Sequence, residues 1–126
     1  YFKILKNIED KKMLSKFNFQ VFYQDYVEGK ILKNILEDIK STQEKLILIM
    51  LQKNNKKIEI YVLVTKDCFN VITAKDIINT LNESIGSSGG GRDELAQAGI
   101  DYDGNVVELQ EKVSQNISKI IHSKDS

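Results

Sequence analysis

The sequence predicts an α/β fold in which a small mixed sheet of about three strands is packed with helices and preceded by a helical arm. Apolar and polar residues alternate over residues 17–23 and 58–64, as they do in strands with one buried face. The continuous apolar run 46–51 is typical of a central strand that is covered on both faces. Elsewhere, apolar residues recur at intervals of three and four positions, which predicts helices against the sheet.

The first half of the chain divides into an arm, a strand, a helix and a hairpin. Residues 1–16 are charged with one narrow apolar stripe, which is typical of a coiled-coil or strut helix. We therefore assign 1–16 to the end of a helical arm and 17–126 to a globular C-terminal domain. Gly29 ends the first strand segment, and a helical apolar pattern follows it. The runs 46–51 and 58–64 flank a polar turn, which predicts a β-hairpin.

Two capping pairs predict the helices of the second half. Thr73 with Asp76 three residues later is a weak version of the capping box. Asn105 and Glu108 form the corresponding pair before a last amphipathic segment. Residues 122–126 are expected to form a frayed polar tail. Because the chain contains no proline, its turns depend on Gly, Asn and Asp.

Length and composition are ordinary for one soluble domain of 126 residues. The longest apolar run is far shorter than the roughly 20 residues of a membrane-spanning helix, so we expect no membrane contact. The formal net charge of zero argues against bulk electrostatic coating of nucleic acid, so a polyanion must bind a local patch. Cys68 is the only cysteine, which excludes an internal disulfide and favours a reducing, cytoplasmic location. The start at Tyr1, without methionine or a signal peptide, suggests a fragment of a larger protein.

The residues needed for catalysis are scarce. With one cysteine and one histidine, neither a zinc site nor a Cys-His or Ser-His-Asp arrangement can be assembled. Asp101 and Asp103 precede Gly104, but the other ligands of a calcium loop are missing, which favours a solvated turn. No Gly-Lys-Ser/Thr follows the glycine triplet, so a P-loop is excluded. We expect binding without bond-breaking, and neither a metal nor a cofactor in this fragment.

The glycine triplet 89–91, followed by Arg92, the only arginine, is the strongest functional signal. Consecutive glycines suit a turn with positive φ or a close approach of the backbone to a phosphate, and a guanidinium beside them suits a phosphate or a base edge. The alternative is that the glycines only end the preceding helix, with Arg92 as a surface charge. The segment 96–99, Ala-Gln-Ala-Gly, contains small residues, one amide and another glycine, which favours close packing of the backbone.

Together, these two motifs resemble the signature of the C-terminal domain of alanyl-tRNA synthetase, a module also found in DHH-family phosphoesterases. The resemblance covers residues 17–121, and residues 1–16 resemble the end of the synthetase's helical arm. Asp93 stands where the family usually has proline, in a position to pair with Arg92, and Ile100 replaces a second glycine. Arginine after the glycines favours the synthetase branch, because the phosphoesterase branch tends to carry histidine there.

The resemblance implies a non-catalytic RNA-binding domain that holds the elbow of tRNA during alanylation and editing. The parent protein would then be an alanine–tRNA ligase, with ATP, Mg and Zn bound outside this fragment. In this interpretation the glycines allow close approach, Arg92 contacts phosphate or base, and Gln97 donates a hydrogen bond or shapes the loop. The hairpin lysines are a second candidate phosphate contact, although solubility alone explains them more simply. The candidate RNA-binding residues are Gly89, Gly90, Gly91, Arg92, Gln97, Gly99, Lys53, Lys56 and Lys57.

Two hypotheses of other classes stay open at this point. The chain would instead be the substrate-holding domain of a DHH-type nucleotide phosphoesterase if a metal-bearing DHH domain preceded it. It would be an oligomerisation module if the helix 1–16 paired between chains. The upstream sequence separates the first alternative from the synthetase, and sedimentation at several concentrations tests the second. The selectivity among tRNAs, the oligomeric state and the source organism do not follow from the sequence.

Overall fold

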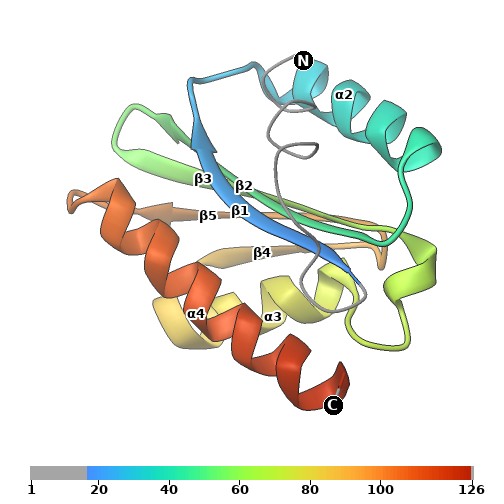
Figure 1. Ribbon diagram of the computed structural model, residues 1–126. Coiled ribbons are helices and arrows are strands. Elements are labelled where there is room, and N and C mark those ends of the chain that lie inside the picture. Colours follow the sequence, from blue (N-terminus) through green and yellow to red (C-terminus); the bar gives the residue numbers. More distant parts are fainter. Residues whose placement is uncertain (1–16, 126) are drawn as a thin grey trace.

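A five-stranded mixed sheet forms the centre of the computed structural model, which describes residues 17–125 (Figure 1). Helix α2 lies on one face of the sheet, and helices α3 and α4 lie on the other. The α/β class and the mixed sheet are therefore as predicted. The arm expected at residues 1–16 lies outside the described residues, and the boundary after residue 16 stays a prediction.

The sheet has the strand order β1-β2-β3-β5-β4. β1 runs parallel to β2, because the connection between them includes α2, and the other neighbouring strands are antiparallel. The predicted hairpin is β2–β3, and its turn places Asn55 at a φ of 59°. The strands are β1 (Asn18–Gln24), β2 (Leu46–Asn54), β3 (Lys57–Val64), β4 (Ser88–Gly91) and β5 (Leu95–Asp101).

The sequence predicts about three strands, whereas the sheet has five, and β4 and β5 are the two that the sequence does not indicate. Residues 89–91, expected in a turn, form most of strand β4, and the small residues 96–99 belong to β5. Glycine and alanine are depleted in strands, so intrinsic propensity argued against both elements. β5 pairs with β3, and β4 in turn pairs with β5, and these pairings overcome the weak intrinsic preference of both segments.

The helices follow the predicted apolar patterns. They are α2 (Gly29–Thr42), α3 (Ala74–Ile85) and α4 (Val106–Asp125), with a short 3-10 helix η1 (Lys66–Cys68). The capping box of α3 is complete: Thr73 Oγ1 accepts from the Asp76 N–H at 3.1 Å, and the Asp76 carboxylate accepts from the Thr73 N–H at 3.2 Å. Gly86, with a φ of 80°, ends α3, so the helix stop precedes the glycine triplet.

Helix α4 differs from its prediction in its cap partner and at its C-terminal end. Asn105 Oδ1 caps the N-terminus, as expected, but it accepts from the Val107 N–H, at 2.8 Å, and not from Glu108, the predicted partner. The helix continues to Asp125, whereas residues 122–126 were predicted to fray. Ile121 is 1% exposed, so the last turns are attached to the core although His122 and Lys124 are solvent-exposed.

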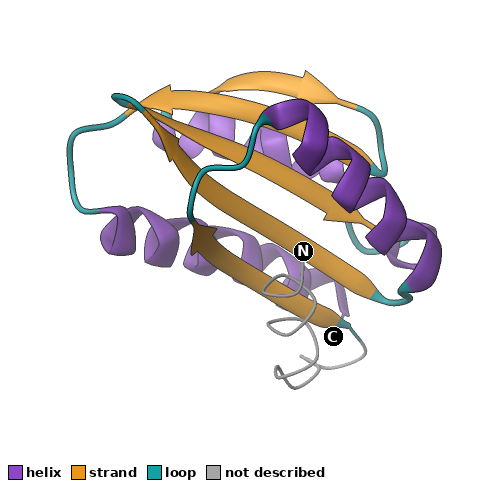
Figure 2. Ribbon diagram, turned by 90° about the horizontal axis from the view of Figure 1, so that it is seen from above, coloured by secondary structure: helices purple, strands orange, loops and turns teal. Residues whose placement is uncertain are grey.

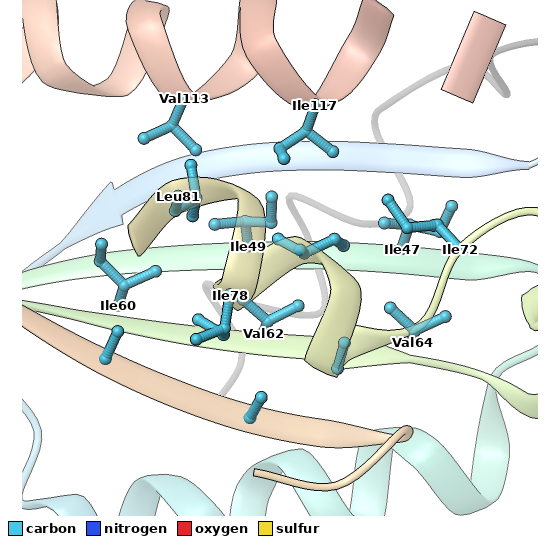
Figure 3. Close-up of a cluster of buried hydrophobic side chains, with 14 of the residues drawn as sticks. Ile47, Ile49, Ile60, Val62, Val64, Ile72, Ile78, Leu81, Val113 and Ile117 are labelled. Carbon is cyan, nitrogen blue, oxygen red and sulfur yellow. The ribbon is translucent and has the colours of Figure 1, made fainter. Parts of the chain in front are cut away.

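Alternation along the strands divides the buried side chains into two clusters. Ile47 and Ile49 face α3 and α4, where they meet Val113 and Ile117 in the larger cluster (Figure 3). Leu51 belongs to the same cluster. The intervening residues of β2 face α2 instead, and β2 is buried from Leu46 to Gln52, as expected of a central strand. Viewed from the α2 side, this helix crosses only part of the sheet (Figure 2).

The remaining observations concern the single cysteine and the length of the helices. Cys68 is buried in the larger cluster, and this burial raises the pKa of its thiol to about 11. None of the helices between residues 17 and 125 combines the length and hydrophobicity needed to cross a bilayer.

Candidate nucleic-acid interface

Two of the three glycines in β4 are required by the neighbouring strand. Gly89 pairs with Ala98, and Gly91 pairs with Ala96. A Cβ at Gly89 would lie 2.2 Å from the Gln97 carbonyl oxygen, and one at Gly91 would lie 2.5 Å from the Cα of Ala96. The expected close approach therefore exists at these two positions, but it is made by strand β5 of the same sheet.

Gly90 and Gly99 have a different environment, on the α2 side of the sheet. A Cβ at Gly90 would meet no atom within 4 Å, and one at Gly99 would meet first the flexible Lys57 side chain, at 2.8 Å. Neither glycine has a positive φ, since only Gly86 and Gly91 do among the described glycines. Their backbone is therefore left accessible by the absence of a side chain and not by an unusual conformation.

Two adjoining hollows occupy the part of the sheet that α2 leaves open. The Lys57 hollow has a volume of about 330 Å³ and is lined by Lys57, Glu59, Tyr61, Gly90, Gln97 and Gly99, among others. The Arg92 hollow, of about 320 Å³, is lined by residues that include Lys33, Glu37, Tyr61, Gly90, Arg92 and Gln97. Because Tyr61, Gly90 and Gln97 line both, we treat the two hollows as one surface, the open face.

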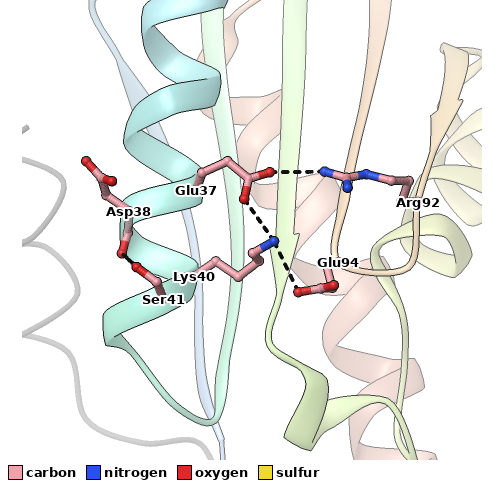
Figure 4. Close-up of polar contacts among 6 residues, drawn as sticks. All are labelled: Glu37, Asp38, Lys40, Ser41, Arg92 and Glu94. Carbon is pink, nitrogen blue, oxygen red and sulfur yellow. Dashed lines mark hydrogen bonds and ion pairs between the residues drawn. The ribbon is translucent and has the colours of Figure 1, made fainter.

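Arg92 borders the open face through an ion pair with α2. Its Nη2 lies 3.0 Å from Oε1 of Glu37, whose Oε2 lies 2.8 Å from Lys40 Nζ (Figure 4). Lys40 also approaches Glu94, at 3.3 Å. The hydrogen bond from Lys40, together with Arg92, lowers the pKa of Glu37, while the hydrogen bond to Glu37 raises the pKa of Lys40.

The Arg92 side chain pairs with Glu37 and not with the adjacent Asp93, which the sequence offered as a partner. The Arg92 N–H donates to the Leu95 carbonyl at 2.8 Å, which closes a tight turn between β4 and β5. In that turn Arg92 points to Glu37 on α2, whereas the Asp93 carbonyl accepts from the N–H of Ala74 at the start of α3. The Arg92 side chain is 68% exposed, so a partner in solution can reach it.

The hairpin lysines do not act as one group. Lys57 lines its hollow, whereas Lys53 and Lys56 are exposed outside both hollows. Lys53 lies two residues after Leu51, so strand alternation places it on the α3/α4 side of the sheet. Of the nine predicted site residues, the open face brings together Lys57, Gly90, Arg92, Gln97 and Gly99, while the backbones of Gly89 and Gly91 form its edge.

The structure adds residues that sequence reasoning missed. Glu59 and Tyr61 alternate with buried β3 residues, which marks them as lying on the other face but does not indicate a role. Lys33 and Glu37 lie on α2, where their only signal is a polar helical position. Asp101 and Asp103 are exposed, and between residues 17 and 125 no group of three or more His, Cys, Asp or Glu side chains gathers as a metal site would require.

Residues 16–119 match the DHHA1 domain family, and the chain belongs to this family. It is similar to alanine–tRNA ligases of two bacteria. It is 31% identical to that of Colwellia psychrerythraea over 88 residues, which is 70% of this chain and 10% of the relative. It is 27% identical to that of Buchnera aphidicola subsp. Cinara cedri over 118 residues, which is 93% of this chain and 13% of the relative. The chain thus spans only about a tenth of the length of these curated relatives.

The fold is also similar to that of a solved structure, the C-Ala domain from Aquifex aeolicus alanyl-tRNA synthetase. The TM-score is 0.60, with 24% sequence identity, and the match covers 82% of this chain and 99% of that domain. At this identity the likeness establishes the fold, and it confirms the predicted α/β class.

Proposed function

We propose that this chain is the C-terminal domain of an alanine–tRNA ligase and that it binds the elbow of tRNA through the open face. Membership of the DHHA1 family, the two ligase relatives and the C-Ala fold support the assignment. The domain itself is non-catalytic in this proposal. Alanylation and editing, with ATP, Mg and Zn, belong to other parts of a cytoplasmic parent enzyme, and the domain holds the tRNA for them.

The observation that carries the proposal is the uncovered backbone of Gly90 between cationic side chains at the two ends of the open face. Gly90 lines both hollows, with Lys57 at one end of the open face and Arg92 and Lys33 at the other. The loops at the tRNA elbow expose phosphates and base faces, which proteins recognise through shape, stacking and backbone contacts. A strand without a side chain at Gly90 lets such a loop approach closely.

The ion pair with Glu37 does not prevent Arg92 from binding phosphate. Arg92 is 68% and Glu37 43% exposed, and ion pairs between exposed side chains contribute at most about 1 kcal/mol. A phosphate offers a charge-assisted, bidentate alternative to the single Arg92–Glu37 contact. Exchange of one anion for the other therefore costs little, and Arg92 is held near its binding position before RNA arrives.

The test is a tRNA titration of the 126-residue chain at two salt concentrations, by fluorescence anisotropy. Arg92→Ala is expected to weaken binding and to reduce the salt slope by about one, because one phosphate contact is lost. Lys119→Ala is the matched control, since it removes a positive charge from an exposed position on α4, behind the sheet. Equal binding by Arg92→Ala and the wild type would contradict the proposal for Arg92, and equal losses in both variants would indicate unspecific charge attraction.

Outcomes of the same titration separate the remaining hypotheses. Preference for short oligonucleotides over tRNA would favour the substrate domain of a DHH-type phosphoesterase. Sedimentation at several concentrations tests self-association through residues 1–16. We expect micromolar or weaker affinity from the isolated domain, because the net charge is zero and few phosphates are contacted. Tethering within the parent enzyme raises the effective concentration.

A further inference from the structure

The Lys57 hollow contains a carboxylate that phosphate binding does not explain. Glu59 lines it beside Tyr61 and Gln97, and the Glu59 side chain is half-buried. No lysine or arginine in the described part of the chain lies within ion-pair distance of Glu59. A negative side chain at this position repels the RNA backbone, so this end of the open face is suited to a different part of the RNA.

Neighbouring amides hold the Glu59 carboxylate in place. Oε1 accepts from Gln52 Nε2 at 2.7 Å, and Oε2 accepts from Asn54 Nδ2 at 3.3 Å. Gln52 is 1% exposed and is itself fixed by both main-chain groups of Val27, at 2.8 and 3.2 Å. A carboxylate offers about four acceptor sites, so the two amide bonds orient Glu59 without using all of its acceptor capacity, even with the hydrogen bond to Tyr61.

Aromatic side chains accompany this carboxylate. Tyr61 lines the hollow and is almost buried, while Tyr26, next to Val27, is 50% exposed. Burial raises the pKa of Tyr61, and the charges of Glu59 and Tyr26 and a side-chain hydrogen bond with Glu59 add to this effect. An aromatic side chain in the wall of a hollow offers an unstacked base a surface for stacking, and Tyr61 occupies such a position.

We propose that the Lys57 hollow takes one unstacked guanine of the bound RNA and that Glu59 accepts hydrogen bonds from its Watson–Crick edge. This inference rests on the proposed RNA-binding function. Guanine is the only common base with two adjacent donors on that edge, N1–H and N2–H₂, whereas each other base places an acceptor beside its donor and meets repulsion from a carboxylate. Lys57 and Arg92 then contact the flanking phosphates, so Glu59 determines which base is selected.

The experiment measures binding of four labelled pentaribonucleotides, UUGUU, UUAUU, UUCUU and UUUUU, to the 126-residue chain. The wild type is expected to bind UUGUU at least about fivefold more tightly than the others, in line with the usual discrimination by a good bidentate contact. In Glu59→Gln this preference falls below about twofold, while affinity for the other three is equal or higher because a negative charge is lost. Glu111→Gln, at an exposed position on α4, is the matched control and keeps the preference.

Equal binding of all four pentanucleotides by the wild type overturns the proposal. A Glu59→Gln variant that binds all four more weakly and still prefers UUGUU also overturns it, because that result shows that Glu59 only shapes the hollow. A tRNA titration with Arg92→Ala, run beside these measurements, keeps the two proposals apart. If tRNA binding depends on Arg92 but no guanine preference is found, only the proposed role of Glu59 is contradicted. If the chain does not bind tRNA at all, the proposed function itself is contradicted.

Discussion

The two faces of the sheet differ in how completely helices cover the same set of strands. Helices α3 and α4 cover one face with an apolar cluster that extends from β1 to β5. On the other face, α2 packs mainly on β1, β2 and β3 and leaves the end at β5 and β4 open and polar. Strand β3 contributes to both, with Ile60 in the packed cluster and Glu59 and Tyr61 on the open face. The proposed binding surface on this fold therefore results from incomplete cover by helices.

The largest expected effect on stability comes from the face of the sheet that α3 and α4 cover. Ile49 is 0% exposed in the larger cluster, so Ile49→Ala is expected to lower the free energy of unfolding by about 2–5 kcal/mol, through lost burial and the cavity left behind. Gln97→Ala, at an exposed position on the open face, is expected to change it by less than about 0.5 kcal/mol. Urea denaturation measures both. Similar losses in the two variants would contradict the difference between the faces.

Substitution of two adjacent glycines, Gly89 and Gly90, is expected to have different effects on stability, of intermediate size. Gly89→Ala places a methyl group against the backbone of β5 and is expected to cost about 1–3 kcal/mol of stability, as overpacking does. Gly90→Ala places it in open space and is expected to leave stability unchanged or raise it by up to about 1 kcal/mol. Thermal denaturation compares the two.

Gly90→Val sharpens this comparison further. Because its larger side chain enters the open face, the variant is expected to fold normally and to bind tRNA more weakly. Undiminished tRNA binding by a folded Gly90→Val variant would show that RNA does not approach the strand at this position.

The smallest expected effect concerns the ion pair at the edge of the open face. Glu37→Gln releases Arg92 and is expected to raise tRNA affinity by about two- to fivefold, since an exposed pair contributes up to about 1 kcal/mol. Asp38→Asn, one position along α2 and exposed, removes the same charge without touching Arg92 and serves as the control. An equal gain in both variants would point to net charge and not to the ion pair.

The pH dependence of that gain follows from the lowered pKa of Glu37. Because Lys40 and Arg92 hold this pKa below the ordinary value of a glutamate side chain, the advantage of Glu37→Gln persists at neutral pH and disappears only when the pH falls through the lowered pKa. The ion pair also contributes to stability over the same pH range. This contribution is fully present above the unfolded-state pKa of Glu37 and is lost as the pH falls through the lowered pKa of the folded state. Titrations at several pH values between neutral and acid check this.

Most of the fold could be predicted because its signals are local. The apolar run of β2, the alternation in β3 and the capping box at Thr73 depend on residues close in sequence. The sequence predicts a turn at 89–91, since three glycines carry neither alternation nor β-propensity. Residues 89–91 form a strand because they pair with β5, for example Gly89 with Ala98. This pairing depends on how two separate segments meet in the fold, which local sequence signals do not reveal.

The sequence by itself determined the α/β class, the elements with apolar periodicity, and the glycine-arginine and Ala-Gln-Ala-Gly motifs through which the chain resembles its family. Only the tertiary structure decided what each motif residue does. It turned Gly89 and Gly91 toward β5, left Gly90 uncovered, paired Arg92 with Glu37, and placed Glu59 and Tyr61 beside Gln97. The physical reason is that a hollow consists of side chains from strands that are distant in sequence, and its shape depends on where α2 stops covering the sheet.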